Sequence, residues 1–245
     1  MKIYRSIELG AAELNEKFSN ETDVEIHYEL MTDEELLHSD FDLIELSEKQ
    51  NQAILSTMPL LDWPIQSTGA VDAFVREKNK FKPIHLSATA FVSFLQSKQI
   101  AVDIAKYAVL IGDYSFLITY AISLAKLGFK KIYLVSPNNI NYKNQLQAVQ
   151  KFLFNVQLRQ LTLDEMANIA DTASLLAIDF NLNEHPDLVE TLTYFNFVAE
   201  KAIFFDLQNF LNDSLSSEAE KASLRVLDSV EFHLHKYRLF QKNHK

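Results

Sequence analysis

The segment 112–115 (GDYS) has the residue types and position of a turn that can bind phosphate groups. It follows the apolar run 107–112 (YAVLIG) and precedes apolar residues at helical spacing over 116–127. A turn between a buried strand and a helix is where dinucleotide-binding domains hold a pyrophosphate, because free backbone N–H groups point at the ligand there. The second glycine of such a turn lets the backbone approach the phosphates, and that position holds Tyr114. We therefore expect only weak, generic anion binding at this turn.

The other residues whose side chains could take part in catalysis or bind a metal form no recognisable catalytic set. His233 and His235 are two residues apart, which on a helix directs them to different faces, so we expect surface histidines rather than a metal pair. The acidic residues at 33–35, and Glu45 with Glu48, are expected to be solvated faces. The sequence contains no GxSxG, HExxH or P-loop motif. We expect no metal site.

The composition excludes several classes of protein. The chain has 245 residues, 23 basic and 33 acidic, for a net charge of −10, which argues against nucleic-acid and anionic-membrane binding. It contains no cysteine, so disulfides, thiolate catalysis and iron–sulfur clusters are excluded. Its four glycines compare with about 17 at ordinary usage, too few for a complete glycine-rich phosphate cradle. No apolar run approaches the ~18–20 residues of a membrane span, and residues 1–17 resemble no signal peptide. We expect a cytoplasmic protein.

The elements that must position these residues alternate regularly in the second half of the chain. Strands are expected at 107–112, 131–136, 156–161, 174–180, 202–207 and 224–228, with helices at 116–127, 145–154, 163–169 and 230–242. Strand–helix–strand alternation at this spacing predicts a parallel sheet with helices on both faces. Gly128 is expected to end the first of these helices.

The first hundred residues show a different pattern. Strands are expected at 24–30, 41–46, 71–76 and 81–86, with short helices among them and a longer helix at 88–99. No glycine- or serine-rich linker separates the two regions, so the join near 100–106 is expected to be rigid.

Four segments carry a resemblance to a known family. They are 69–81 (GAVDAFVREKNKF), 85–95 (HLSATAFVSFL), 107–139 (YAVLIGDYSFLITYAISLAKLGFKKIYLVSPNN) and 204–236 (FFDLQNFLNDSLSSEAEKASLRVLDSVEFHLHK). In this order they resemble the shikimate dehydrogenases, and the resemblance is collinear over about 41–240. No single motif is intact.

The resemblance implies an α/β protein of two domains. Residues 1–100 would form the α/β substrate-binding-like domain, completed by the C-terminal helix 230–245, and residues 101–229 the Rossmann-like domain with a doubly wound parallel sheet. Shikimate dehydrogenases interconvert 3-dehydroshikimate and shikimate with NADPH, so the family cofactor is NADP.

The family's catalytic positions are altered. Segment 44–49 (IELSEK) resembles the motif that holds the catalytic lysine, which would be Lys49; the alternative is an ordinary surface lysine at a helix start. The paired aspartate falls on Ser87, which cannot tune the lysine pKa electrostatically, and losing such an acid–base group lowers the rate by ~10²–10⁴. The neighbouring family asparagine falls on His85, for which a structural or exposed role is favoured over that of a base.

The substrate-binding positions are altered as well. A family asparagine falls on Asp72, whose charge would repel a substrate carboxylate. A family glutamine on the last helix falls on Lys236, which could attract that carboxylate, although a solvated helix face is the favoured interpretation.

The cofactor positions that the resemblance assigns are Gly112, Tyr114, Ser115, Ser136 and Asn138. Tyr114 adds bulk at the closest approach to the phosphates, and the motif arginine falls on Ile118. Segment 136–138 (SPN) replaces the element that grips the 2′-phosphate, with no arginine in it. We expect no cofactor and no tight dinucleotide binding.

Three functional hypotheses follow from these positions. The first is a non-catalytic pseudoenzyme that acts as a binding or regulatory module for a protein partner or small metabolite. The second is a divergent NAD(P)-dependent oxidoreductase of the shikimate or quinate dehydrogenase type that uses Lys49. The third is a metabolite sensor that uses the cleft between the domains. A monomer or homodimer is expected in each case, with no nucleic acid or membrane as partner.

Overall fold

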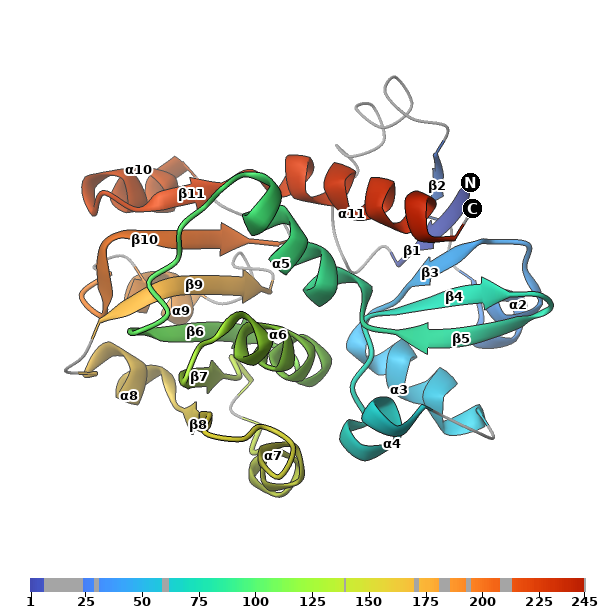
Figure 1. The fold of residues 1–245 in the computed structure, drawn as a ribbon, viewed down its shortest axis with the longest axis horizontal. Helices are drawn as coiled ribbons and strands as arrows, with labels where there is room; N and C mark the ends of the chain where they lie inside the picture. The colour runs from blue at the N-terminus through green and yellow to red at the C-terminus, as the bar shows by residue number, and fades with distance from the viewer. Residues whose placement is uncertain are drawn as a thin grey trace.

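Two sheets organise the chain (Figure 1). The computed structural model describes residues 1–6, 24–28, 31–58, 62–138, 140–169, 172–180, 186–192, 195–207 and 213–244. Within the described part of the chain, every helix is too short or too polar to cross a bilayer.

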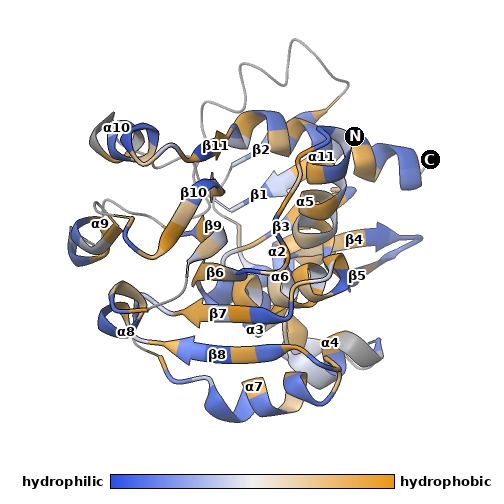
Figure 2. Cartoon of the chain, turned by 60° about the vertical axis from the view of Figure 1, so that its left-hand side comes forward, coloured by the Kyte–Doolittle hydropathy of each residue, from blue (hydrophilic) through white to orange (hydrophobic). Residues whose placement is uncertain are grey.

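The second sheet is parallel throughout, as the strand–helix alternation predicted. Its order is β11-β10-β9-β6-β7-β8. The strands are β6 (Tyr107–Gly112), β7 (Lys131–Val135), β8 (Gln157–Leu161), β9 (Ala173–Asp179), β10 (Val198–Asp206) and β11 (Arg225–Leu227). The central strands are buried on both faces, whereas β8 at the edge is largely hydrophilic (Figure 2).

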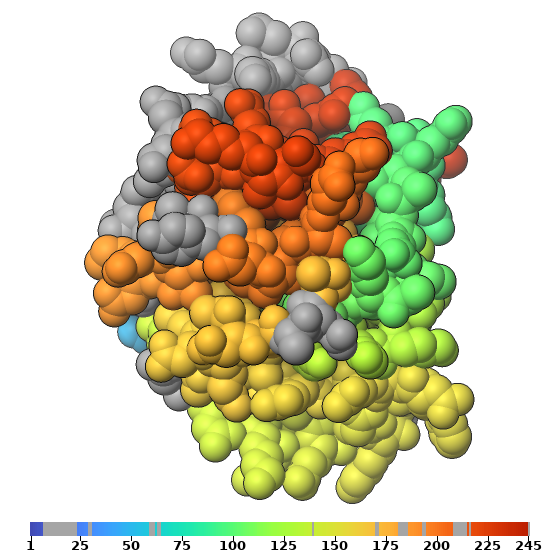
Figure 3. Space-filling model, turned by 90° about the vertical axis from the view of Figure 1, so that its left-hand side faces the viewer, coloured from blue at the N-terminus to red at the C-terminus, as the bar shows by residue number. Residues whose placement is uncertain are grey.

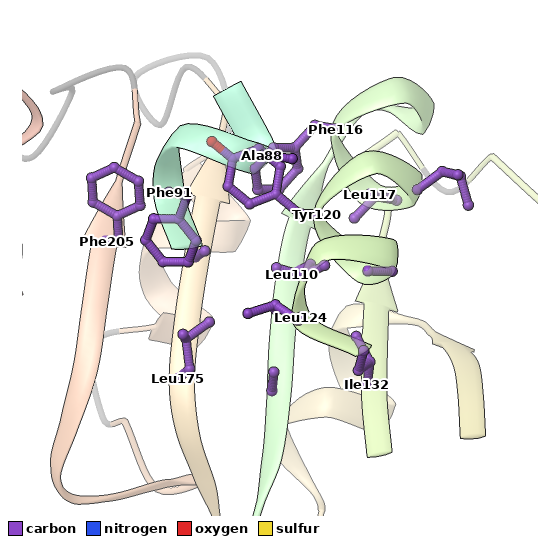
Figure 4. Close-up of a cluster of buried hydrophobic side chains, with 14 of the residues drawn as sticks. Ala88, Phe91, Leu110, Phe116, Leu117, Tyr120, Leu124, Ile132, Leu175 and Phe205 are labelled. Carbon is purple, nitrogen blue, oxygen red and sulfur yellow. The ribbon is translucent and has the colours of Figure 1, made fainter. Parts of the chain in front are cut away.

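Helices cover both faces of this sheet. They are α6 (Tyr114–Leu127), α7 (Lys143–Gln150), α8 (Leu163–Ala167), α9 (Pro186–Leu192) and α10 (Asp213–Lys221). One core lies under α5 (Leu86–Ser97) and α6, and a second lies under α8, α9 and α10. In the first core Phe91 stacks on Phe205, and Phe116 and Tyr120 on α6 point towards α5 (Figure 4). Helices α9 and α10 had no counterpart among the expected elements.

The first sheet mixes parallel and antiparallel pairs in the order β2-β1-β3-β4-β5. The strands are β1 (Lys2–Arg5), β2 (Glu25–His27), β3 (Leu43–Glu45), β4 (Ala73–Glu77) and β5 (Lys80–Ile84). Strand β1 lies parallel to β2 and β3, and β4 pairs antiparallel with both of its neighbours. Strand β1 was not expected from the sequence. The helices of this lobe are α2 (Asp33–His38), α3 (Glu48–Thr57) and α4 (Trp63–Thr68).

Two helices join the lobes. Helix α5 leads from β5 towards β6, and α11 (Ser229–Asn243) packs against it and runs back to the first lobe, where both termini of the chain lie (Figure 1). On the opposite side, α4 contacts α7. Contacts between helices on both sides therefore hold the two lobes together. Figure 3 shows the end of the second lobe remote from the first, where segments distant in the sequence form one continuous surface.

Candidate functional site

The turn between β6 and α6 is closely packed. Strand β6 ends at Gly112, and Asp113 is the N-cap of α6. A Cβ atom at position 112 would lie 2.5 Å from Cδ1 of Phe116 and 3.1 Å from the carbonyl oxygen of Asp179. Any side chain at this position would clash with the phenylalanine ring that rests on the backbone, so glycine is strongly favoured here.

Tyr114 extends from this turn into the first lobe. Its side chain is 8% exposed, and its hydroxyl donates a hydrogen bond to the carbonyl oxygen of Thr68 at the end of α4. Its ring lies 5.1 Å from that of Tyr142. Burial raises the pKa of Tyr114 to about 12, so the phenol stays neutral at physiological pH. Tyr114 thus links the two lobes across the turn.

A carboxylate of this chain occupies the N-terminus of α6. Glu48 Oε2 accepts a hydrogen bond of 3.0 Å from the backbone N–H of Ser115. The hydroxyl of Ser115 accepts a second bond, of 3.4 Å, from the backbone N–H of Val71. Negative charge is favoured at this place because the helix dipole and the unpaired N–H groups of the first turn attract it. Glu48 was expected on a solvated face, but its carboxylate makes this contact between the lobes.

The segment after β7 presents no charge. Ser136 and Pro137 are buried and Asn138 is exposed. Charge-assisted hydrogen bonds to a phosphate need Arg or Lys, and segment 136–138 contains neither.

A buried cluster of charged groups lies where the last helix meets the first sheet. Glu45 on β3 accepts hydrogen bonds from Arg5 at 2.9 Å and from the hydroxyl of Tyr237 at 2.5 Å, and its other oxygen accepts one from Lys236. The four residues come from β1, β3 and α11, and Arg5, Glu45 and Lys236 are each at most 3% exposed. The solvated positions expected for Lys236 and Glu45 are wrong, because each is the other's buried counter-ion.

The cluster shifts the pKa values of its members. Burial alone would raise the pKa of Glu45, but the charges of Lys236 and Arg5 hold it at about 2. Burial lowers the pKa of Lys236 and raises that of Tyr237 well above its usual range. The carboxylate is therefore ionised and bound to groups of this chain.

Asp72 caps α5. Its two carboxylate oxygens accept hydrogen bonds from the backbone N–H groups of Leu86 at 2.6 Å and Ala88 at 3.2 Å. Burial raises its pKa, against the charge of nearby His85. His85 Nε2 donates to the carbonyl oxygen of Ala70 at 2.9 Å. Asp72 and His85 thus both hold the start of the helix in place.

Ser87 and Lys49, which the resemblance places together at the hydroxyl of a substrate, do not contact each other. Ser87 is buried, 8% exposed, in the first turn of α5. Lys49 is exposed in the first turn of α3 and makes no hydrogen bond or ion pair with any described residue. The two side chains therefore have no contact through which one could tune the other.

The two histidines of α11 do point to different faces. His233 is buried, contrary to the surface position expected, and Nε2 donates to the carbonyl oxygen of Leu207 at 3.0 Å. Burial, then the charges of Lys236 and Arg5, lowers its pKa well below its usual range. His235 forms a 3.1 Å hydrogen bond with Ser93. Among the described residues no group of acids and histidines could hold a metal ion.

Sequence reasoning missed Arg5, Tyr120 and Tyr237. The Tyr120 hydroxyl is buried without a hydrogen-bond partner among the described residues. The sequence contained one signal of the buried charged cluster. Glu45 lies between Ile44 and Leu46 in a run expected to be a strand, and an acid buried there needs a cation as its partner.

No family model matches the sequence, and no curated protein matches it. Solved structures do. Shikimate 5-dehydrogenase from Thermus thermophilus in complex with shikimate is 15% identical, with a TM-score of 0.65 over 98% of this chain and 92% of that chain. Quinate dehydrogenase from Corynebacterium glutamicum in complex with NAD is 12% identical, with a TM-score of 0.66 over 96% and 89%. Shikimate dehydrogenase 1 from Peptoclostridium difficile is 11% identical, with a TM-score of 0.66 over 98% and 91%.

The chain has the shikimate dehydrogenase fold. The structural match spans nearly the whole chain and confirms the fold that the four sequence segments indicated. In doubly wound parallel sheets that bind a dinucleotide, the phosphates lie at the turn between the first strand and the helix after it, and in this sheet that turn joins β6 to α6. Here this position holds Glu48, Tyr114 and Phe116.

Proposed function

We propose that this protein is a non-catalytic member of the shikimate dehydrogenase fold that acts as a binding or regulatory module. The observation that carries the proposal is the hydrogen bond from Ser115 N–H to Glu48. The N-terminus of α6 is the anion site of a dinucleotide domain, and here a carboxylate of the chain occupies it.

Electrostatics opposes a cofactor at this place. A pyrophosphate about 4 Å from a carboxylate is repelled by roughly 4 kcal/mol per pair of unit charges at an effective dielectric constant of 20. Neither segment 136–138 nor Ile118 supplies a compensating cation. The Tyr114 side chain further fills the approach that a second glycine would leave open.

The substrate side supports the same proposal. Glu45 already binds the ammonium group of Lys236, which a substrate carboxylate could otherwise engage. Ser87 replaces the family aspartate, and exposed Lys49 has no acidic partner among the described residues. Proton transfer at a substrate hydroxyl would need both groups held together.

Calorimetric titration with NADPH and NADH, with and without shikimate or quinate, tests the proposal. We expect no binding tighter than about 1 mM and no change in absorbance at 340 nm in an activity assay. The Thermus thermophilus enzyme, crystallised with NADP(H) and shikimate, is the positive control. Micromolar binding of either cofactor, with turnover abolished by Lys49→Ala, would instead establish a divergent oxidoreductase.

A further inference from the structure

The turn between α7 and β8 exposes two phenylalanine side chains. It comprises residues 151–156 (KFLFNV), and we call it the aromatic turn. Phe154 is 89% exposed and Phe152 is 42% exposed, whereas the neighbouring Leu153 and Val156 pack into the core under α5 and α6. The turn is therefore anchored from below while most of the apolar surface of Phe154 lies in water, which is unfavourable unless a partner covers it.

The amino ends of three parallel strands lie side by side next to this turn. Ile132 of β7 pairs with Ala108 of β6 and with Leu158 of β8. All three contact the same core under α5 and α6. Lys106 and Lys130 stand two positions before Ala108 and Ile132, and residues two apart in a strand share a face. The two lysines thus lie on the side of the sheet that carries the aromatic turn.

Lysines flank the aromatic turn on both sides. The carbonyl oxygen of Lys130 accepts a 2.7 Å hydrogen bond from the N–H of Gln157, the residue directly after the turn. Lys151 begins the turn as the C-cap of α7. Lys130 and Lys151 are exposed and Lys106 is half-buried. None of the three forms an ion pair with a described residue, so their ammonium groups are available to a partner.

Ile104 extends the apolar surface towards β6. Its side chain is 43% exposed, and its Cδ1 atom lies 2.8 Å from the place of a Cβ atom at Gly128, two residues before Lys130. Figure 3 looks onto this end of the lobe, where the loops follow one another down the right-hand side from green through yellow-green to yellow. The amino-end patch, as we call it, consists of Ile104, Phe152 and Phe154 with Lys106, Lys130 and Lys151.

The charge of the amino-end patch is opposite to that of the whole chain. Segment 114–163 contains six basic residues and no acidic one. Asp103 is the nearest acid along β6, and its carboxylate accepts the N–H of Ala105. Asp164 lies beyond the far end of β8, roughly 15 Å from Gln157 at ~3.3 Å per residue. That distance exceeds the ~8 Å over which physiological salt screens a charge. The net charge of −10, which argued against an anionic membrane, therefore acts little on the patch.

The shape of the patch selects the kind of partner. Phe154 stands out from a turn, so a partner must deform around its ring. The headgroup layer of a bilayer does so, and it accommodates aromatic side chains together with lysines whose ammonium groups reach the phosphates. A second copy that met patch to patch would bring like charges together. Single-stranded nucleic acid is bound in a groove that tracks its backbone, which a protruding ring does not provide.

We propose that the amino-end patch docks this protein on an anionic lipid surface, with Phe154 inserted among the headgroups and the three lysines at the level of the phosphates. The proposal goes beyond the binding module proposed above. The patch contains none of the cofactor or substrate positions, so titration with NADPH and binding to vesicles have independent outcomes.

Cosedimentation of the full chain with vesicles tests this. We expect binding to phosphatidylcholine vesicles that contain about 30% phosphatidylserine, weaker binding as salt is raised, and no binding to pure phosphatidylcholine. Absence of binding to the anionic vesicles, or equal binding to the neutral ones, overturns the proposal. So does oligo-dT that binds as tightly as the anionic vesicles and loses as much affinity in Phe154→Ser, because the patch would then be a nucleic-acid site.

Two variants locate the contact. Phe154→Ser should weaken vesicle binding about tenfold, because the ring no longer leaves water. Lys130→Gln with Lys151→Gln should weaken it about thirtyfold, because each lysine near an anionic surface contributes ~1 kcal/mol. An unchanged affinity in either variant contradicts the proposed contact.

Matched controls lie elsewhere on the molecule. Val226→Ser removes a side chain that is 39% exposed on β11, at the opposite edge of the sheet. Lys80→Gln with Lys242→Gln removes two exposed lysines from β5 and from the last turn of α11. Neither control should change vesicle binding more than about twofold. Losses equal to those of the patch variants would overturn the proposal.

Phe154→Trp gives a gain of signal that unfolding cannot mimic. The chain has a single tryptophan, Trp63 on α4, so wild type supplies the baseline. Anionic vesicles should shift the fluorescence of the variant to shorter wavelength and leave that of wild type unchanged, because an indole inserted at a membrane interface leaves water. A variant that binds the vesicles without this shift would show that position 154 does not insert, and would refute the proposal.

Discussion

Removing the charge of Glu45 should destabilise the protein strongly. Its side chain is 2% exposed, and the partner side chains of Arg5 and Lys236 are 4% and 1% exposed. Glu45→Gln keeps the shape but leaves two buried cations without their carboxylate. Breaking a buried ion pair in this way costs about 3–5 kcal/mol of unfolding free energy. This is a large fraction of the ~5–15 kcal/mol that holds an ordinary domain folded.

The lowered pKa of Glu45 gives a loss of unfolding free energy of similar magnitude, and it predicts how that loss depends on pH. Its pKa falls from 4.5 to about 2 in the folded protein, which corresponds to roughly 3 kcal/mol at 1.36 kcal/mol per pKa unit. Because the folded pKa is the lower one, this stabilisation is present above pH ~4.5 and is lost as the pH falls towards 2. The stability difference between wild type and Glu45→Gln should therefore narrow over that interval.

Urea unfolding of wild type and Glu45→Gln at pH 7, and at steps from pH 5 to 2.5, measures both effects. Glu165→Gln, which removes an exposed carboxylate with a lowered pKa, is the control and should cause little change. Lys236→Met should be less destabilising in the Glu45→Gln background than in wild type, because the two residues interact directly. A loss below about 1 kcal/mol for Glu45→Gln, or a difference that stays constant with pH, would refute the reasoning.

Three further predictions concern the turn between β6 and α6, and each is tested by urea unfolding at pH 7. Glu48→Gln should lower the unfolding free energy by about 0.5–2 kcal/mol, because the N-terminus of α6 loses its anion. If the variant and the wild type have the same unfolding free energy at low salt, the contact is not electrostatic. Gly112→Ala should lower it by about 1–3 kcal/mol through a clash with Phe116, and Phe116→Leu should recover part of that loss; two additive losses would contradict the clash. Tyr114→Phe should lower it by about 1 kcal/mol, because the Thr68 carbonyl loses its donor; a more stable variant would contradict that bond.

The parallel sheet could be predicted from the sequence because its signals are local. Buried strands such as 107–112 are continuous apolar runs, and each is bounded by glycine, proline or a helix-period segment. The order of four family-like segments pointed to the shikimate dehydrogenase fold, and the structural match confirms it. Strand β1 was not predicted because its four residues alternate weakly and are defined by their partners β2 and β3.

Residue types alone predicted what the site would lack. The resemblance to the family predicts Tyr114 in place of a glycine, Ser87 in place of an aspartate and an uncharged segment 136–138. The expected consequence of each replacement can be worked out one residue at a time.

Only the tertiary structure decided what fills the site. Glu45 and Lys236 are 191 positions apart, and each, taken alone in the sequence, is typical of a solvated residue. Glu48 and Ser115 lie on different lobes and meet because α5 and α11 hold the two sheets together. Whether a charged side chain lies in water or against a counter-ion depends on which distant element covers it. Local periodicity does not contain that information, because it depends on which distant elements pack together in the folded chain.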